Sequence, residues 1–399
     1  MPPLRRLTAT TRAVSRVNQT VLLETLRAEG PASRQQLAAL TGLSSATVNR
    51  LVEALKREGL IVDAERAPST GGRPPQLIRY NADAQTVLAL ALGPRRIIGA
   101  VADLAGTVRY REERPTLAPG EAAPGDNEIF HNLLAFIRDL AKRAGRLAAP
   151  PRAVAVGVPG VVGGQNGRVE FAPALGWRSM PLAALLTEEL GLPVAVENNV
   201  NLIALATHRH GPGIGMQHMA VVVAEVGVGA GLILGGSLHR GRLGGAGEVG
   251  YLLLEHDSLD RPWPGFGDLE SRIGLAGIGR RMAGAGFTVG DGELPAVGQL
   301  FEAARSGNGR AGKLVRELAD DFSLLVANVA VLLSPEQIAL GGETFRRGAD
   351  LLLPAIEARL QGRIPAVPRL VVVESADVEI VGAAELAIEA SAGTAFLTH

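Results

Sequence analysis

The chain has 399 residues, of which 47% are hydrophobic and 20% are charged, and its 40 basic residues balance 40 acidic ones. This length exceeds one ordinary domain, and the composition is that of a well-packed, water-soluble protein. The absence of cysteine excludes disulfides and thiolate metal sites, and no apolar run has the length of a membrane span or a signal-peptide core. We therefore expect two or three packed units, a cytoplasmic location and no membrane contact.

Three short helices are predicted near the start of the chain. The first covers about 18–28, and Ser33 caps a second whose apolar residues recur with helical spacing. Gly42 provides a tight turn, and Ser44 caps a third helix. The apolar residues that this third helix turns inward are Val48, Leu51, Val52 and Leu55. The pattern is that of a helix-turn-helix, although a solvated helical hairpin in a larger bundle has the same spacing.

Two short β-like runs, at 60–63 and 77–80, follow the helix pair. The segment between them contains Gly72 and Arg73 ahead of two prolines, and it is too rich in Gly and Pro to be helical. Such a hairpin after a helix pair is typical of a winged helix-turn-helix, which disfavours the bundle alternative. A stiff, extended arm of this kind can place a guanidinium in a narrow minor groove.

Charge also indicates that the first 80 residues contact nucleic acid. They hold twelve Arg or Lys against six Asp or Glu, a net charge of +6, so the remainder of the chain carries −6. A basic head on an acidic body is the pattern of a protein that contacts nucleic acid with one end. Residues 1–16 are basic and are expected to order only on DNA. The candidate DNA-binding residues are Arg34, Ser44, Ser45, Thr47, Asn49, Arg50, Gly72 and Arg73.

From residue 86 the sequence predicts two similar α/β lobes with a cleft between them. The first set consists of strands at 87–92, 97–103 and 107–110, a helix at 127–144, strands at 153–158 and 194–197, and a helix at 200–208. The second consists of strands at 219–225, 231–234 and 250–255, helices near 268–281, 300–305 and 311–333, and a strand at 337–340. Strands at 371–375 and 378–380 and a helix from 382 complete the chain. The expected domains are 1–80, 86–200 with 382–399, and 201–381.

Several motifs follow one another along the body in a specific order. They are Gly157-Val158-Pro159-Gly160, Ala172-Pro173-Ala174-Leu175-Gly176-Trp177, Glu197-Asn198-Asn199-Val200-Asn201, Gly227-Val228-Gly229-Ala230-Gly231, Gly244 to Tyr251, and Gly341-Gly342. With the helix-turn-helix and its Gly72-Arg73-Pro74 wing, the chain resembles the ROK family of repressors, open reading frames and sugar kinases from residue 18 to about 390. The resemblance implies an α/β, actin-like (ribonuclease-H-like) ATPase fold of two lobes behind the winged head.

The resemblance also implies a sugar site between the lobes. Carried over by motif position, its residues are Asn198, Asn199, Glu248, Tyr251 and Glu270. Convergent carboxylates and amides suit sugar hydroxyls because they accept and donate hydrogen bonds in fixed directions. Tyr251 stands where the family has a histidine, which leaves the identity of the sugar open. The alternative for Glu248 and Glu270 is that they are ordinary surface acids.

Departures from the family pattern argue against catalysis. Asn199 replaces the aspartate that serves as general base in the kinases, and an amide cannot take a proton near neutral pH. The first phosphate loop falls on 91–95, where its Asp and Thr are missing and Pro94 lacks a backbone N–H donor. Glu225 and Val226 replace a Gly and a Thr of the second phosphate loop. We expect no catalytic residue and no cofactor.

No metal site is expected either. The family's zinc-binding cysteine cluster is replaced by the segment from Asp260 to Asp268, in which Trp263 and Phe266 are suited to hold the loop by packing. His208 and His210 are two residues apart near a helix end, which is poor ligand spacing, and they are expected to be solvated.

These observations predict a transcriptional regulator, a repressor of sugar-uptake or sugar-utilisation genes that senses a carbohydrate effector. Its expected partners are a double-stranded DNA operator with an inverted repeat, a small sugar and a second copy of the chain, in a homodimer or a dimer of dimers. One alternative is a ROK sugar kinase with an accessory DNA-binding domain. Another is a regulator controlled by a protein partner.

Overall fold

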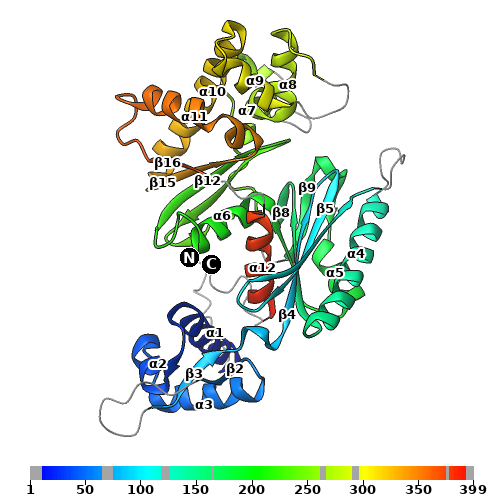
Figure 1. The fold of residues 1–399 in the computed structure, drawn as a ribbon, viewed down its shortest axis with the longest axis vertical. Coiled ribbons are helices and arrows are strands. Elements are labelled where there is room, and N and C mark those ends of the chain that lie inside the picture. Colours follow the sequence, from blue (N-terminus) through cyan, green and yellow to red (C-terminus); the bar gives the residue numbers. More distant parts are fainter. Residues whose placement is uncertain are drawn as a thin grey trace, which may run out of the picture.

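The chain forms a small head and a two-lobed body in the computed structural model, which describes residues 11–64, 75–117, 126–163, 166–260, 267–289, 296–373 and 377–391 (Figure 1). Both lobes contain a β-sheet, and helices α6 and α12 lie between the sheets (Figure 1). Within the described ranges, no helix is both long and apolar enough to cross a bilayer.

The head contains three helices and a three-stranded antiparallel sheet. Its elements are α1 (Thr11–Glu29), β1 (Ala32–Ser33), α2 (Arg34–Thr41), α3 (Ser45–Arg57), β2 (Ile61–Asp63) and β3 (Leu77–Tyr80). Strand β3 lies between β1 and β2. The core of the head includes Leu22, Leu26, Leu37, Val48, Leu51, Val52, Leu55, Ile61 and Ile78. The predicted helix-turn-helix and the strands that flank the wing are confirmed.

Helix α1 begins earlier than predicted. The sequence analysis placed its start at Asn18, but the helix extends back to Thr11. Residues 11–17 contain no Gly or Pro, so the helix can continue through them toward the N-terminus. Asn18 therefore lies inside the helix and is not its N-cap. The expectation for residues 1–10 lies outside the described residues.

The first lobe is organised around a five-stranded sheet in the order β11-β7-β4-β5-β6. Its strands are β4 (Thr86–Leu92), β5 (Arg96–Asp103), β6 (Val108–Pro115), β7 (Pro151–Val158) and β11 (Val194–Asn198). The lobe also contains η1 (Ala82–Ala84), α4 (Asp126–Leu147), β8 (Val161–Gly163), β9 (Arg168–Ala172), η3 (Pro173–Leu175), β10 (Trp177–Met180) and α5 (Leu182–Leu190). Helix α5 and the small sheet β8–β10 were not predicted from the sequence.

Alternation along the strands of this sheet separates two cores. In β4, Leu88 and Leu90 face a cluster with α4 and α5, whereas Val87 and Ala89 face α12 (Val378–Ser391) on the other side. Side chains two residues apart lie on one face of a strand, so each face has its own composition. Because alanines dominate the face toward α12, that helix packs close to the sheet.

The second lobe repeats the strand arrangement of the first. Its sheet has the order β14-β13-β12-β15-β16, in which β12, β13 and β14 are antiparallel and β15 and β16 are parallel to β12, as β7 and β11 are to β4. The strands are β12 (His218–Ala224), β13 (Val228–Leu234), β14 (Ser237–Leu238), β15 (Gln337–Gly341) and β16 (Arg369–Val372). The helices are α6 (Asn199–His210), η4 (Val249–Tyr251), η5 (His256–Asp260), α7 (Asp268–Ile273), α8 (Leu275–Gly284), α9 (Val297–Arg305), α10 (Gly309–Leu333) and α11 (Glu343–Leu360). The predicted two-lobed α/β fold is confirmed.

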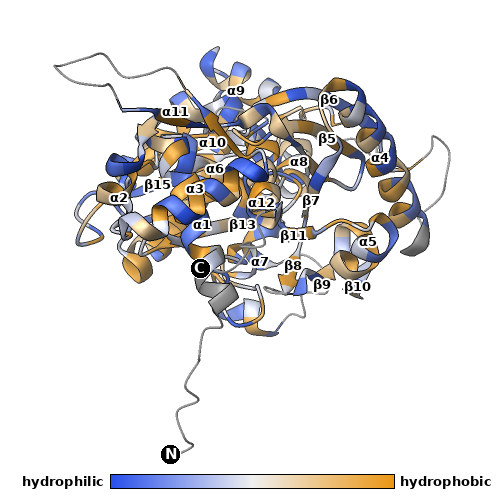
Figure 2. Cartoon of the chain, turned by 90° about the horizontal axis from the view of Figure 1, so that it is seen from below, coloured by the Kyte–Doolittle hydropathy of each residue, from blue (hydrophilic) through white to orange (hydrophobic). Residues whose placement is uncertain are grey.

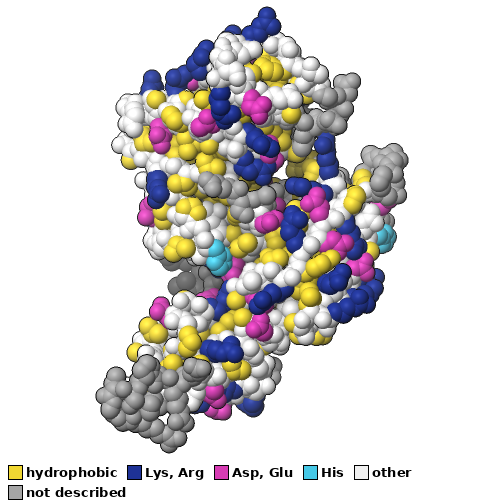
Figure 3. Space-filling model, in the orientation of Figure 1, with side chains coloured by type: hydrophobic (Ala, Val, Ile, Leu, Met, Phe, Trp, Pro, Cys, Tyr) yellow, Lys and Arg dark blue, Asp and Glu magenta, His cyan; other side chains and the backbone are white. Residues whose placement is uncertain are grey.

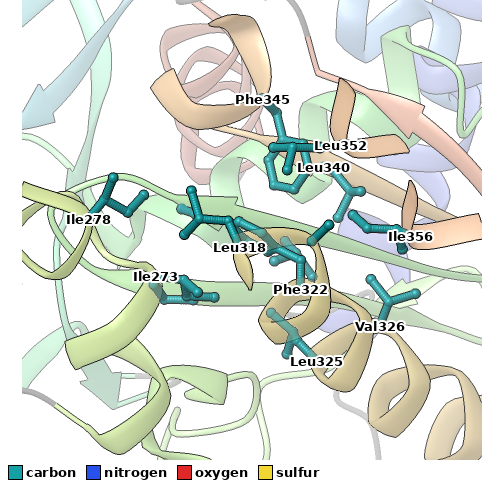
Figure 4. Packing of buried hydrophobic residues seen from close by; sticks show 14 of the residues in the cluster. Ile273, Ile278, Leu318, Phe322, Leu325, Val326, Leu340, Phe345, Leu352 and Ile356 are labelled. Carbon is teal, nitrogen blue, oxygen red and sulfur yellow. The ribbon is translucent and has the colours of Figure 1, made fainter. Parts of the chain in front are cut away.

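Helices α10 and α11 cover the outer face of the second sheet with a large apolar core. Phe322 of α10 packs edge to face against Phe345 of α11, with ring centroids 4.7 Å apart (Figure 4). Leu340 of β15 and Ile356 of α11 lie in the same cluster (Figure 4). Figure 2 shows why such helices need a covering partner, since α3 and α4 carry hydrophobic and hydrophilic residues on different faces.

Three predicted elements of the body are wrong in type or extent. The expected strand at 250–255 is the 3₁₀ turn η4 followed by coil, because Gly250 sits against the side chain of Glu270 and the carbonyl of Val228. The expected strand at 378–380 is the first turn of α12, whose apolar residues are buried on most sides and lack a helical period. The helix expected at 268–281 is broken at Gly274, which has an extended backbone. Helix α11 was not predicted.

Gly382 controls how closely α12 approaches α6. A Cβ at this position would lie 2.0 Å from the carbonyl oxygen of Leu202, so the substitution Gly382→Ala must push the two helices apart. We expect it to lower the free energy of unfolding by about 1–3 kcal/mol, as overpacking does. Gly145→Ala in α4 is the control: nothing lies within 4 Å of its Cβ position, and it should raise stability by about 0.5–1 kcal/mol. Urea denaturation measures both, and equal effects would contradict this assignment.

Candidate functional site

The turn between α2 and α3 is built as the sequence predicts. Ser33 caps α2 in a capping box with Gln36, and Gly42 ends that helix with a φ of 68°, in the left-handed region. Ser44 caps α3 through a hydrogen bond that its hydroxyl accepts from the backbone N–H of Thr47. The buried side of α3 packs on the core of the head, so its other side is free to face a partner.

The exposed side of α3 carries Ser45, Asn49 and Arg50, and Thr47 is half-buried. Arg34 of α2 donates one hydrogen bond to Asn49 Oδ1 (2.9 Å) and another to Glu53 Oε1 (2.6 Å). The Arg34 hydrogen bond also lowers the pKa of Glu53. Six of the eight candidate DNA-binding residues therefore lie on or beside one helix, while Gly72 and Arg73 lie outside the described residues.

Positive charge is not confined to one part of the visible surface. In the view of Figure 3, Lys and Arg side chains are spread over the head and both lobes, interleaved with Asp, Glu and hydrophobic residues. On the recognition side of α3, the charge of Arg34 is balanced by Glu53, whereas Arg50 is exposed.

A cavity of about 340 Å³ lies between the two lobes. All five residues predicted for the sugar site line it: Asn198, Asn199, Glu248, Tyr251 and Glu270. They come from the junction of β11 and α6, from η4 with the residue before it, and from α7. The structure therefore brings together side chains that are up to about 70 positions apart in the sequence.

Most of the hydrogen-bonding groups of the Asn198 side chain are used within the protein. Its Oδ1 accepts hydrogen bonds from the backbone N–H groups of Val200 and Asn201, which caps α6, and its Nδ2 donates to the carbonyl of Gly160 (2.7 Å). These bonds take up both oxygen lone pairs and one of the two amide hydrogens. Asn198 is thus a cap that holds the cleft wall, and Asn199 beside it is the amide placed at the cavity surface.

Two carboxyl groups, those of Glu248 and Glu270, line the cleft. Burial, together with a smaller contribution from the charge of Glu248, raises the pKa of Glu270 to about 7, against a hydrogen bond from the backbone N–H of Val228 (3.1 Å). Burial also raises the pKa of Glu248. Burial and the charges of Glu270 and Glu248 raise the pKa of Tyr251, which lines the same cavity. Groups of this kind favour hydroxyl-bearing ligands, because a neutral acid can donate as well as accept a hydrogen bond.

Glu225, at the position of the family's second phosphate loop, also lines the cavity. Its Oε1 accepts a hydrogen bond (3.0 Å) from the backbone N–H of Glu343, the first residue of α11. Gly342 before it has a φ of 98°, and a Cβ there would lie 2.1 Å from the carbonyl of Ala224. A helix N-terminus is a natural anion site. Here the chain's own carboxylate occupies one of its donors, and burial raises the pKa of this acid.

Sequence reasoning missed a buried ion pair that joins the lobes beside the cleft. Arg240, which follows β14, donates to Glu197 Oε2 of β11 (2.6 Å), and both side chains are almost fully buried. Glu197 Oε1 also accepts from Asn201 Nδ2 (2.9 Å). The sequence signal was Glu197 itself, an acid at the end of an apolar strand, which needs a partner when buried.

The two histidines expected to be solvated differ. His210 is exposed, as expected, although its Nε2 also lies 3.1 Å from Glu385 Oε1 in α12. His208 is half-buried, with its Nε2 2.9 Å from the carbonyl oxygen of Met216. The neighbouring Arg209 pairs with Glu385 and Glu389. The packing of α6 against α12 brings these residues together, and neither helix alone predicts the contact.

The structure describes only part of the segment that replaces the family's zinc loop. Trp263 and Phe266 lie outside the described residues, so their packing stays a prediction. Elsewhere, within the ranges that the structure covers, no three His, Cys, Asp or Glu side chains gather as metal ligands.

Comparisons with known proteins match both parts of the chain. The sequence profile of the ROK family matches residues 87–391, and a winged helix-turn-helix DNA-binding profile matches residues 18–62. The xylose repressor of Caldicellulosiruptor bescii is 26% identical over 338 residues, which cover 83% of this chain and 84% of that protein. Transcriptional regulator Rv0485 of Mycobacterium tuberculosis is 32% identical over 338 residues, 80% of this chain and 73% of the relative.

Solved structures agree on the fold. A ROK family transcriptional regulator, a homolog of the E. coli MLC protein, superposes with a TM-score of 0.83 at 22% identity, covering 96% of this chain and 98% of that one. A ROK family glucokinase from Streptomyces griseus, in complex with glucose and AMPPNP, superposes with a TM-score of 0.61 at 26% identity, covering 76% of this chain and 99% of the other. The regulator thus matches the head as well as the body.

The raised pKa of Glu270 leads to a stability test. Because its folded-state pKa is above the unfolded value, its favourable contribution is present below about pH 4.5 and is lost as pH rises through 7. Glu270→Gln cannot ionise, so it should gain stability over the wild type with rising pH, on the order of 2 kcal/mol at pH 8 after allowing for partial exposure. Urea denaturation at pH 5 and 8 measures this, with Glu188→Gln on the exposed side of α5 as control. A difference that does not vary with pH would refute it.

Proposed function

The chain belongs to the ROK family and joins the family's domain to a winged helix-turn-helix, and from this premise we propose a repressor of sugar-uptake or sugar-utilisation genes whose cleft senses a carbohydrate. The observation that carries the proposal is the combination of a head with a free recognition helix and a cleft in which Glu248, Glu270 and Asn199 converge. Relatives named as xylose repressor and transcriptional regulator support it. Such a protein acts in the cytoplasm, where its DNA lies.

The proposed DNA contacts divide into two kinds. Asn49 and Arg50 extend from the exposed side of α3, where an amide and a guanidinium can read base edges in a major groove. Ser44, Ser45, Thr47 and Arg34 lie at the helix N-terminus or beside it, where they are placed for phosphates. The hydrogen bond from Arg34 to Asn49 Oδ1 orients the Asn49 amide before DNA binds. If this bond is kept on DNA, the amide nitrogen of Asn49 is the group that contacts the base.

The proposed assembly is a homodimer, or a dimer of dimers, on an inverted repeat. Each head offers one recognition helix, and specific affinity generally needs two half-sites. A second copy has an apolar surface available on α10, where Leu324, Val331 and Leu332 have relative exposures of 49%, 60% and 77% on one side of the helix. Clustered exposed apolar residues of this kind commonly mark a protein interface.

The kinase alternative is supported by the likeness to the glucokinase. Against it stand Asn199, which cannot act as a base, Pro94 in the first phosphate loop, and Glu225, whose carboxylate bonds the first N–H of α11. A transferring phosphate would meet that negative charge. Control by a protein partner instead of a sugar remains the second alternative, and the ligand titration below separates it from the proposal.

Arg50→Ala should weaken binding to an operator selected from random duplexes by the wild-type protein. Loss of a base-reading contact costs about 1–3 kcal/mol, so we expect a 5- to 150-fold loss on the selected site and less on unrelated DNA. Asn49→Ala should alter the preferred base in the core of the half-site. Fluorescence anisotropy on an inverted repeat and on a single half-site measures both. The control Arg316→Ala removes one exposed cation from α10. If it lowers operator affinity as much as Arg50→Ala does, the effect of Arg50→Ala comes from net charge alone.

Glu248→Gln tests the carbohydrate site. With wild-type protein, operator affinity is measured in the presence of D-xylose, D-glucose, N-acetylglucosamine and their phosphate esters, and the effective sugar should change it by about 5- to 150-fold. The variant should need more of that sugar while its ligand-free DNA affinity is unchanged, because Glu248 lies in the cleft and not in the head. Release at the wild-type sugar concentration would place the effector elsewhere. Glu188→Gln serves as the matched control.

A further inference from the structure

A cluster of charged side chains lies where the head meets the body. Glu385 of α12, whose side chain is 4% exposed, accepts a hydrogen bond from Arg27 of α1 (2.7 Å). It also pairs with Arg209 (3.4 Å) and His210 (3.1 Å) at the end of α6. Arg209 pairs in addition with Glu389, one turn further along α12. These residues line a cavity of about 1220 Å³, and three elements meet at one carboxylate.

The cluster depends on each of its partners. Burial opposes the charge of Glu385, but the hydrogen bond with His210 and the charges of Arg27 and Arg209 outweigh it and lower the pKa of Glu385 to about 2. Burial raises the pKa of the neighbouring Glu24 on α1, against the attraction of Arg209. Removing one partner of a buried charge leaves that charge poorly compensated. The positions of Arg27 and Arg209 are therefore linked through Glu385.

Helix α6 connects this cluster to the cleft. It begins at Asn199, which lines the cavity between the lobes, and ends at His210, so its 12 residues extend over about 18 Å. Its backbone packs closely on both neighbours, because a Cβ at Gly231 of β13 would lie 2.5 Å from Ala204 Cβ, and one at Gly382 of α12 would meet the carbonyl of Leu202. Asn199 and Arg209 belong to one continuous helix, so a movement of that helix displaces both.

Apolar contacts also hold the head against the body. Leu60 and Tyr80 pack against the core of the head and also against the apolar cluster beneath α12. Asn81 donates to the carbonyl of Gly59 (2.8 Å), and Leu104 donates its N–H to the carbonyl of Ala82 in η1. The link between head and body is thus a short, bonded turn. Apolar contacts are non-directional, whereas hydrogen-bonded ion pairs require a specific geometry, so the ion cluster is the contact that is most sensitive to the orientation of the head.

We propose that Glu385 is the positioning residue through which the effector cleft sets the position of the DNA-binding head. Arg27 holds the head to it, and Arg209 and His210 tie α6 to it. When the cleft closes, α6 moves, the hold of Arg209 and His210 on Glu385 changes, and Arg27 carries the change to α1. This inference rests on the proposed function, and it adds the route by which ligand and operator influence each other.

Arg27→Met tests the proposal on the full-length protein. Methionine matches the length of the arginine stem, and Glu385 keeps Arg209 and His210, so the body stays compensated. Sugar affinity, measured by calorimetry with the effective sugar of the panel above, should stay within about twofold of wild type. The sugar-dependent change in operator affinity should fall from about 5- to 150-fold to less than twofold. Retained coupling would overturn the proposal.

A second readout needs neither sugar nor DNA. Because the chain has no cysteine, spin labels can be placed at Ala39→Cys in the head and Glu188→Cys in the first lobe, both exposed. Double electron–electron resonance should give a narrow distance distribution in wild type and a broad or shifted one in Arg27→Met. An unchanged distribution would overturn the proposal even if no sugar in the panel acted on the wild-type protein. A sugar panel without effect on the wild-type protein would instead contradict the proposed carbohydrate effector.

Two further variants separate positioning from general destabilisation. Arg281→Met removes a comparable arginine, 24% exposed, which pairs with Asp321 (2.7 Å) and Glu317 (3.2 Å) in the second lobe, and it should change neither the distance distribution nor the coupling. Arg27→Lys keeps a cation at the junction and should restore most of the narrow distribution. Loss of coupling in Arg281→Met, or no rescue by lysine, would show that Glu385 has no specific positioning role.

Discussion

Helix α6 lies with its backbone against both neighbours, and this close approach constrains the rest of the body. The missing side chain at Gly231 lets α6 pack closely on the second sheet. The missing side chain at Gly382 lets it pack closely on α12, which covers the first sheet. A side chain at either position would separate the layers. The helix that carries Asn199 into the cleft is therefore also the helix that carries Arg209 to the head, and neither end can move independently of the other.

The cleft and the head junction use buried charge in opposite ways. In the cleft, burial raises the pKa values of Glu248 and Glu270, and that of Glu270 reaches about 7. At the junction, Glu385 is surrounded by cations and stays ionised. The first arrangement suits a ligand that exchanges hydrogen bonds, and the second suits a rigid connection that loses strength when one partner is withdrawn.

Local patterns determined much of the fold. Ser33, Gly42 and Ser44 specified the helix-turn-helix because capping and left-handed backbone are properties of single residues and their near neighbours. Strands β4, β7, β12 and β15 were visible as continuous apolar runs, whereas β6 is mostly charged and β14 was not predicted. The apolar pattern gave a wrong prediction at 378–380, because α12 is a helix that is buried on most sides. It also gave wrong predictions at Gly250 and Gly274, where tertiary contacts determine the backbone conformation.

Motif order and residue chemistry along the chain were enough to identify the family, the two kinds of unit and five of the residues that line the cleft. The use of those residues follows from packing in three dimensions. This packing assigned Asn198 to capping α6, placed the carboxylate of Glu225 on the first N–H of α11, and brought Arg27 to Glu385 across 358 positions. Such contacts depend on how closely helices and sheets pack in space, and sequence separation carries no record of that distance.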